Sequence, residues 1–132
     1  MSIPTHLQHQ PVITVDNYDG KDGIHTGDTD AKALSIGRAQ YDSTQFSAKV
    51  FRQTDSGRWS RQSEEMPLHR VLDLAILLVG AMKREAGQES SMTSLDEKIL
   101  SASGFQDLQR YLKDPCNAQH LNPRLDELKR LL

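Results

Sequence analysis

The clearest hydrophobic pattern in the 132 residues lies between residues 67 and 86, where apolar side chains recur at helical spacing. One stripe at this spacing comprises Leu68, Val71, Leu72, Ala75, Val79 and Met82, and a second stripe beside it comprises Leu74, Leu77, Leu78 and Ala81. Pro67 fits the first helical turn, and Lys83 and Arg84 fit the last. The pattern predicts one long helix. Its apolar arc is wider than one small sheet needs, so the C-terminal helices or another subunit are expected to cover the second stripe.

Strand signals precede this helix at regular intervals. Residues 33–41, 46–53 and 58–62 carry strand-forming residues, and turn-forming residues separate them. In the middle segment Phe46, Ala48 and Val50 alternate with Ser47, Lys49 and Phe51. This alternation places an apolar face on one side and a mostly polar face on the other. The three segments predict an antiparallel β-meander, and residues 11–15 predict a further short strand, at an edge because of Pro11.

The C-terminal third carries the signals of several short helices. Ser94 and Glu97 have the spacing of a capping box, which predicts a helix from residue 94 to about residue 103. A second helix is expected over 105–113, before Pro115, and a third from Asn122 onward. The predicted fold class is therefore α+β: a small antiparallel β-meander packed on one long central helix, with short C-terminal helices on the other side.

Net charge is −2, but acidic and basic residues are separated along the chain. Residues 1–31 hold five aspartates and one lysine, whereas residues 32–61 hold six cations and two aspartates. Several Asp-Gly pairs also favour turns before residue 31. We therefore divide the chain into an acidic, turn-rich arm at 1–31 and a single α+β domain at 32–132. Two interpretations stay open: the arm lies on the basic sheet, or the sheet meets an anionic partner.

Composition does not indicate a membrane protein. The continuously apolar run at 74–82 is far shorter than the roughly 20 residues that a helix needs to cross a bilayer core. The N-terminal residues lack the basic and apolar regions of a signal peptide, so we expect a cytoplasmic protein. Cys116 is the single cysteine, so an internal disulfide cannot form.

Cations alternate with aromatic residues on the predicted meander. Guanidinium groups neutralise phosphates and aromatic rings stack on unpaired bases, so this mixture suits single-stranded nucleic acid. It also suits an acidic protein partner or the rim of an ordinary core. The candidate partner-binding residues are Arg38, Lys49, Phe51, Arg58, Trp59 and Arg61, with Tyr41 and Arg52 beside them in the sequence pattern.

A second candidate site lies at the start of the long helix. His69 and Asp73 are spaced i and i+4, and Glu64 lies just upstream. A carboxylate that orients a histidine is half of a general-base arrangement. A nucleophile is missing, because Ser63 fits the simpler role of a helix cap. The weak catalytic candidates are thus His69, Asp73 and Glu64, in a pocket beside the acidic loop, and a surface pair of His69 with Asp73 is the simpler interpretation.

The sequence indicates no cofactor and no metal. The aspartates of residues 16–30 lack the ligand spacing of a calcium-binding hand. His6 and His9 lie near the terminus with nothing to fix their geometry, so we expect ordinary polar residues there. The glycines between residues 20 and 27 lack the Lys-Ser or Lys-Thr of a phosphate-binding loop.

Three runs of sequence resemble the central block of an uncharacterised bacterial family of unknown function. They are LSIGRAQ at 34–40, AKVFR at 48–52, and residues 57–80, which contain RWSRQSEE and PLHRVLDL. The resemblance covers the block 34–80 and implies a similar fold with no particular chemistry. The sequence therefore favours a non-enzymatic binding or assembly module. Its expected partners are a second copy in a homodimer, an acidic protein or single-stranded nucleic acid, and the alternative is a small hydrolase or ligand-binding enzyme.

Overall fold

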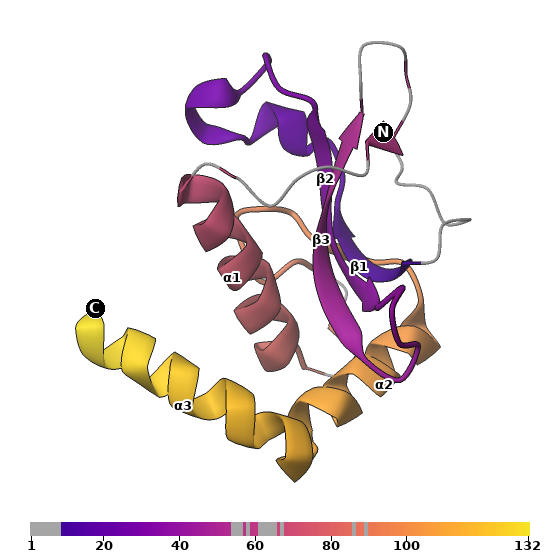
Figure 1. The fold of residues 1–132 in the computed structure, drawn as a ribbon, viewed down its shortest axis with the longest axis vertical. Helices are drawn as coiled ribbons and strands as arrows, with labels where there is room; N and C mark the ends of the chain where they lie inside the picture. Colours follow the sequence, from indigo (N-terminus) through magenta and orange to yellow (C-terminus); the bar gives the residue numbers. More distant parts are fainter. Residues whose placement is uncertain are drawn as a thin grey trace.

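The computed structural model describes residues 9–53, 57, 59, 60, 66, 68–85, 87, 88 and 90–132. Figure 1 shows one twisted sheet with a long helix lying along one of its faces and two further helices at one end. The strands are β1 (Gln10–Val15), β2 (Ala31–Arg38), β3 (Phe46–Gln53), β4 (Trp59–Ser60) and β5 (Lys98–Ile99). The helices are α1 (Leu68–Lys83), α2 (Ala102–Lys113) and α3 (Pro115–Leu131), with short 3-10 helices η1 (Tyr18–Gly20) and η2 (Gly23–His25).

The sheet confirms the predicted α+β class and the predicted meander. All strand pairs are antiparallel, in the order β4-β3-β2-β1-β5. The strand expected at 11–15 is present as β1, but it lies inside the sheet and not at an edge. A β-bulge at Pro11 accommodates the missing N–H group, and Pro11 pairs there with Gly37. A Cβ atom on Gly37 would collide with the carbonyl oxygen of Gln10, so the bulge requires glycine at this position.

The long helix predicted at 67–86 is confirmed as α1, and its second stripe packs against both the sheet and the C-terminal helix α2. Leu77 and Ala81 have no exposed surface, and they join the core with Leu34 of the sheet and Leu108 of α2. The second stripe therefore packs against the core. Exposed residues come instead from the first stripe, where Leu68 is 84% exposed. The sequence could not distinguish the stripes, because both are apolar at the same spacing.

The prediction of a helix at 94–103 is wrong. Residues 98 and 99 form β5, which pairs with β1. Glu97 does not serve as the third residue of a capping box, because its buried carboxylate accepts hydrogen bonds from Met92 N (2.6 Å) and Thr93 Oγ1 (2.6 Å). The carboxylate thus closes the loop before β5. Gly80 of α1 packs against Thr93 of this loop, which holds the loop on the helix.

The two last helices have bounds that differ from the prediction. α2 contains the expected segment 105–113 and starts at Ala102, with Ser101 as its N-cap. α3 starts at Pro115 and not at Asn122, and Pro123 lies inside it. Asp114 is the N-cap, since its side chain accepts a hydrogen bond from the Cys116 N–H group. Pro115 therefore both follows α2 and opens α3, a role that suits proline at the first helical position.

Within the part of the chain that the structure describes, helices long and apolar enough to cross a membrane are absent.

His9 is buried on the sheet face that points away from α1, contrary to the expectation of an ordinary polar residue on a free end. Its side chain is 1% exposed, and Nε2 hydrogen-bonds with Ser35 Oγ at 2.9 Å. Nδ1 lies 3.3 Å from Ser47 Oγ. Burial, together with the nearby Lys49 charge, lowers the pKa of His9 to about 4. The imidazole is therefore neutral in the folded protein at neutral pH.

Acidification is expected to destabilise the fold through His9. The unfolded imidazole binds a proton below its ordinary pKa of 6.5, whereas the folded one stays neutral down to about 4. The contribution of neutral His9 is thus complete above pH 6.5 and is lost as the pH falls toward 4, by on the order of 2 kcal/mol. Urea denaturation at pH 7 and at pH 4.5 measures this loss. His9→Gln should show a smaller difference between the two pH values, and equal differences in both proteins would contradict the assignment.

Candidate functional site

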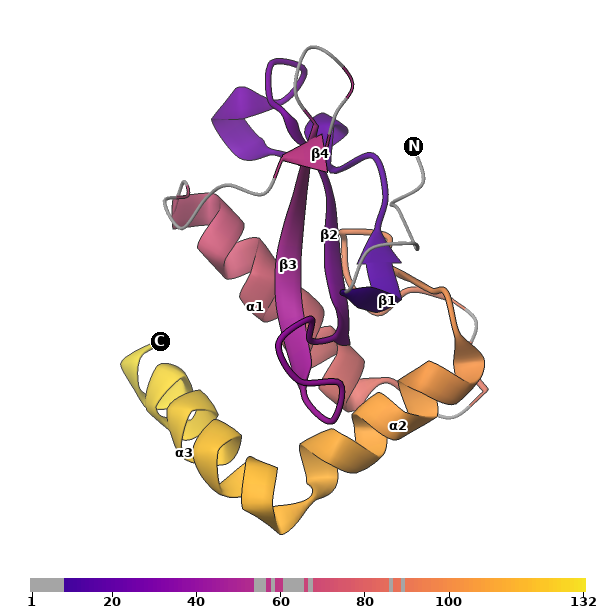
Figure 2. The same ribbon diagram turned by 45° about the vertical axis from the view of Figure 1, so that its right-hand side comes forward.

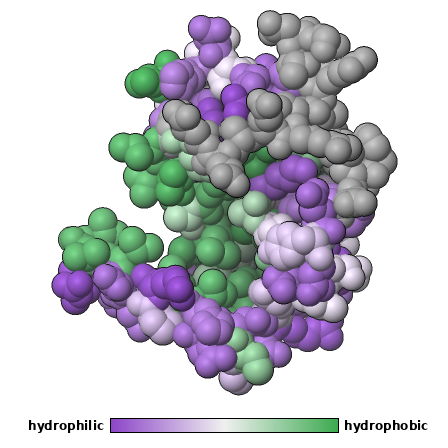
Figure 3. Space-filling view, viewed as in Figure 1, coloured by the Kyte–Doolittle hydropathy of each residue, from purple (hydrophilic) through white to green (hydrophobic). Residues whose placement is uncertain are grey.

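An apolar groove opens between α1, α3 and the sheet. The cavity measures about 360 Å³, within the range of ligand and partner sites. Ile36, Phe46 and Ala48 contribute from the sheet, and Leu74, Ala75 and Leu78 line the side formed by α1. Figure 3 shows this hollow with hydrophobic residues on its floor and on both sides. Its chemistry is therefore that of an apolar contact surface.

The α1 side of the groove continues into exposed residues at the N-terminal half of the helix. Val71 precedes Leu74, Ala75 and Leu78 by three, four and seven positions, so it lies on the same side of α1 as these lining residues. Val71 is 48% exposed. Ile76 is similarly exposed (41%) but lies on the other flank of the helix, between Asp73 and Gly80. The core of the chain thus buries only part of the apolar surface of α1.

The opposite wall is α3, which has no buried residue. Its N-terminal end packs on α2, and its C-terminal half extends away from the rest of the fold (Figures 1 and 2). Leu121 lines the groove, and Leu125, Leu128 and Leu132 follow it at helical spacing. Leu128 is 49% exposed. This helix therefore presents an apolar edge that the chain itself leaves largely uncovered.

Polar groups in the groove are few and mostly engaged. The Tyr111 ring packs edge-on against Phe46, with ring centroids 5.4 Å apart. Asn117 Nδ2 donates to the Tyr111 carbonyl oxygen at 2.9 Å, which ties α3 to α2. His120 also lines the groove. These contacts fix the angle between α2 and α3, and thereby hold the groove open.

The structure divides the candidate partner-binding residues between the two faces of the sheet. Arg38 pairs with Asp107 of α2 at 2.6 Å and lies 5.0 Å from the centroid of the Phe46 ring. Lys49 lies 5.1 Å from the Phe51 ring centroid, on the face that carries His9. Phe51 is 2% exposed, so its ring is not available for stacking on a base. Arg58, Arg61 and the Trp59 side chain lie outside the described residues.

The acidic arm lies on the basic sheet, which is one of the two interpretations of the charge pattern. Asp30 pairs with Arg52 at 2.8 Å, and Asp19 pairs with Lys32 at 3.3 Å. These carboxylates neutralise cations of the basic segment, for which an anionic partner was the alternative interpretation. The basic segment is therefore at least partly neutralised within the chain itself.

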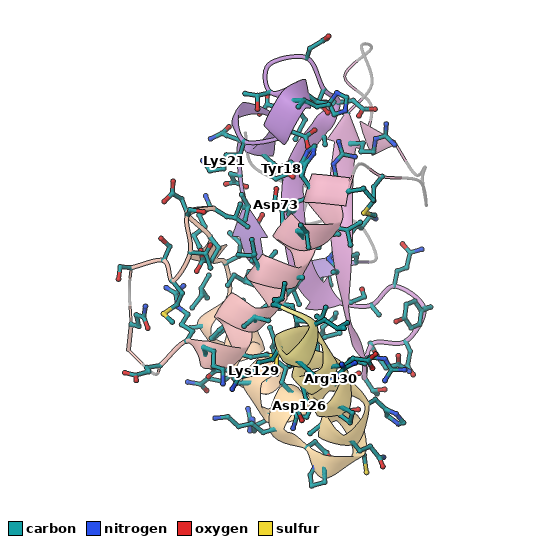
Figure 4. The ribbon with its side chains drawn as sticks, turned by 90° about the vertical axis from the view of Figure 1, so that its left-hand side faces the viewer. Tyr18, Lys21, Asp73, Asp126, Lys129 and Arg130 are labelled. Carbon is teal, nitrogen blue, oxygen red and sulfur yellow. The ribbon has the colours of Figure 1, made fainter. Side chains whose placement is uncertain are left out.

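His69 and Asp73 do not pair with each other. His69 Nε2 donates to Asp22 Oδ1 at 2.8 Å, and Asp73 accepts from the Tyr18 hydroxyl at 2.5 Å. Figure 4 shows Tyr18 and Asp73 directed toward one another where the arm meets α1. Glu64 lies outside the described residues. The predicted proximity of the acidic loop to the start of the long helix is thus present, but the pairs are different.

Asp22 is the centre of this junction, and sequence reasoning did not single it out. Its side chain has no exposed surface and also accepts from Arg70 Nη2 at 2.7 Å and Arg70 Nε at 3.3 Å. Burial alone would raise the pKa of Asp22, but hydrogen bonds from Arg70, His69 and Thr29 outweigh it and hold the pKa below its ordinary 3.8. Burial and the hydrogen bond to Asp73 raise the pKa of Tyr18 above its usual range.

The junction has the properties of a structural joint. The Asp22 carboxylate is shared between His69 and the buried Arg70, so its charge is already compensated. Among the described residues, groups of three or more His, Cys, Asp or Glu side chains that could hold a metal ion are absent. What this arrangement does is fix residues 16–30 on α1. The groove, by contrast, is an accessible surface that the fold leaves uncovered.

Comparison with known proteins identifies a family. The family described as "Family of unknown function (DUF6530)" matches residues 1–107. This confirms the resemblance to an uncharacterised family and extends it beyond the block 34–80. The match ends within α2, so it includes α1 and the sheet side of the groove and stops before α3. The comparisons with curated proteins and with solved structures give no match.

Proposed function

We propose that this chain, which belongs to the DUF6530 family of unknown function, is a non-enzymatic assembly module that forms a homodimer through the groove between α1 and α3. The observation that carries the proposal is the uncovered apolar surface on both walls. Val71 (48% exposed) lies on the side of α1 that lines the apolar cavity, and Leu128 (49% exposed) follows the lining residue Leu121 along α3. Contiguous exposed apolar surface of this kind marks an interaction site in a folded protein.

A protein partner fits this surface better than a small molecule. Exposed apolar residues continue along both helices beyond the cavity, so an elongated occupant that is apolar on two sides would fit them. Such a shape is that of an amphipathic helix lying in a hydrophobic groove. The enzyme alternative has less support, because the Asp22 carboxylate is committed to Arg70 and His69 and the described bond of His69 is to Asp22. The ion pairs of Arg38 and Arg52 likewise favour an apolar contact over an acidic partner.

Val71→Glu is expected to convert the homodimer to a monomer. A carboxylate on the groove side of α1 would be desolvated in the interface, which raises the dissociation constant by at least about 100-fold. Light scattering after gel filtration measures the mass at several protein concentrations. Ile76→Glu is the matched control, since Ile76 is similarly exposed on the opposite flank of the same helix. A monomeric wild type, or a Val71→Glu protein that remains dimeric, would refute the proposal.

A further inference from the structure

The C-terminal half of α3 has little support from the described residues of its own chain. The 17 residues of α3 include none that is buried, and its C-terminal half ends in Leu128, Leu131 and Leu132, which are 49%, 65% and 101% exposed. Most helical stability in proteins comes from packing of an apolar face against other elements. The edge formed by Leu121, Leu125, Leu128 and Leu132 therefore calls for a covering surface.

The groove could be filled by an apolar helix such as α3. It lies beside the 16 residues of α1, a helix about 24 Å long, and α3 is about 25 Å long. The groove side of α1 carries no charge between Val71 and Met82, because Asp73 is directed to Tyr18. The leucine edge of α3 is equally free of charge. The two surfaces match in chemistry, and the C-terminal half of α3 is short enough to lie along α1.

Charged side chains do not lie on this apolar edge. Asp126 and Arg130 are each two positions from Leu128, so they lie on the opposite side of the helix (Figure 4). The edge can therefore pack against a second apolar surface without burying these charges.

The exposed area is compatible with an interface. Leu68, Val71 and the three C-terminal leucines together leave roughly 600 Å² exposed, and an interface of standard size takes about 800 Å² from each partner. A twofold arrangement uses this surface twice, because each copy supplies both a helix and a groove.

We propose that the two copies exchange helices: the C-terminal half of each α3 inserts into the partner's groove, beside the partner's α1, and the two α3 helices pack antiparallel about Leu128. This inference deepens the homodimer proposed above and rests on it. It places α3 and α3 of the partner in the middle of a layer flanked by the two α1 helices.

Cysteine cross-linking of the full-length chain tests the arrangement. In a Cys116→Ser background, Leu128→Cys should form a disulfide-linked dimer for most of the protein under mild oxidation, because the twofold axis brings the two positions together. Asn122→Cys in the same background is the control, since this exposed α3 position lies away from the axis. The control should remain mostly unlinked.

The outcomes separate the exchange from the homodimer itself. Dimers by light scattering that link through residue 128 and not through residue 122 support the exchange. Dimers that fail to link at 128 but link through Val71→Cys would show that α1 pairs with α1, which overturns the exchange and keeps the homodimer. A monomer by light scattering would overturn both.

Discussion

Asp22→Asn is expected to destabilise the fold by about 3–5 kcal/mol, because it leaves a buried arginine without a counter-ion. The Arg70 side chain is 5% exposed, and its guanidinium group donates to both oxygens of the fully buried Asp22 carboxylate. Asparagine keeps the size of the side chain but removes the charge, and its amide group presents hydrogen atoms where Arg70 and His69 need acceptors. The Arg70 charge would then lie in a low-dielectric site without compensation.

Asp30→Asn is the matched control for this prediction. Asp30 belongs to the same arm and also pairs with an arginine, but its side chain is 38% exposed and that of Arg52 is 26% exposed. Such a pair contributes at most about 1 kcal/mol. Urea denaturation of both variants at pH 7 gives the two free energies of unfolding. Similar small losses in both variants would show that Asp22 is not the joint between the arm and α1.

The pKa of Asp22 gives the same prediction a pH dependence. Because its folded pKa is lowered below 3.8, the contribution of the carboxylate is fully present above the unfolded pKa and is lost as the pH falls through the folded value. The free-energy difference between the wild type and Asp22→Asn should therefore shrink below pH 4, as the Asp22 carboxylate becomes protonated. His9 titrates in both proteins, so its effect cancels in the difference.

The importance of Asp22 could not be predicted from local sequence. It is one of five aspartates in a turn-rich segment, and its partners Arg70 and His69 lie 48 and 47 positions away. His69 and Asp73 have helical i, i+4 spacing, which favoured a pair between them. In the fold, Asp73 instead accepts a hydrogen bond from Tyr18 of η1, and His69 bonds to Asp22, which precedes η2. Nonlocal contacts of this kind depend on the path of the arm across the sheet. The hydrophobic periodicity of the sequence carries no information about this path.

Local sequence signals predict the helices and strands well, but they do not predict which elements lie next to one another in space. Alternation identified β3, and Pro67 with the apolar stripes identified α1, because each pattern reports a buried face within one element. Pro11 favoured an edge position for β1, because the sequence does not show the bulge that accommodates this proline inside the sheet. Pro115 was interpreted as the end of α2, although proline is equally suited to the start of α3. The groove depends on the angle between these two helices, and so it could not be predicted.

Leu77→Ala is expected to cost about 2–5 kcal/mol, the range for deletion of a buried leucine side chain. Leu77 has no exposed surface and packs in the core that α1 forms with the sheet and α2. The methyl groups removed would leave a cavity between these three elements, since a packed core relaxes only partly around a missing side chain. Urea denaturation at one fixed protein concentration measures the loss, because dimerisation would otherwise contribute to it.

Leu72→Ala decides between the two possible orientations of α1. Leu72 belongs to the first stripe and is 62% exposed, so its truncation should cost less than about 1 kcal/mol. The two substitutions change helix propensity equally, and the difference between them therefore reports burial alone. Because the stripes lie side by side on one helix, a helix rotated to bury the first stripe would reverse the ranking. A larger loss from Leu72→Ala than from Leu77→Ala would therefore contradict the core and, with it, the apolar wall on which the proposed dimer depends.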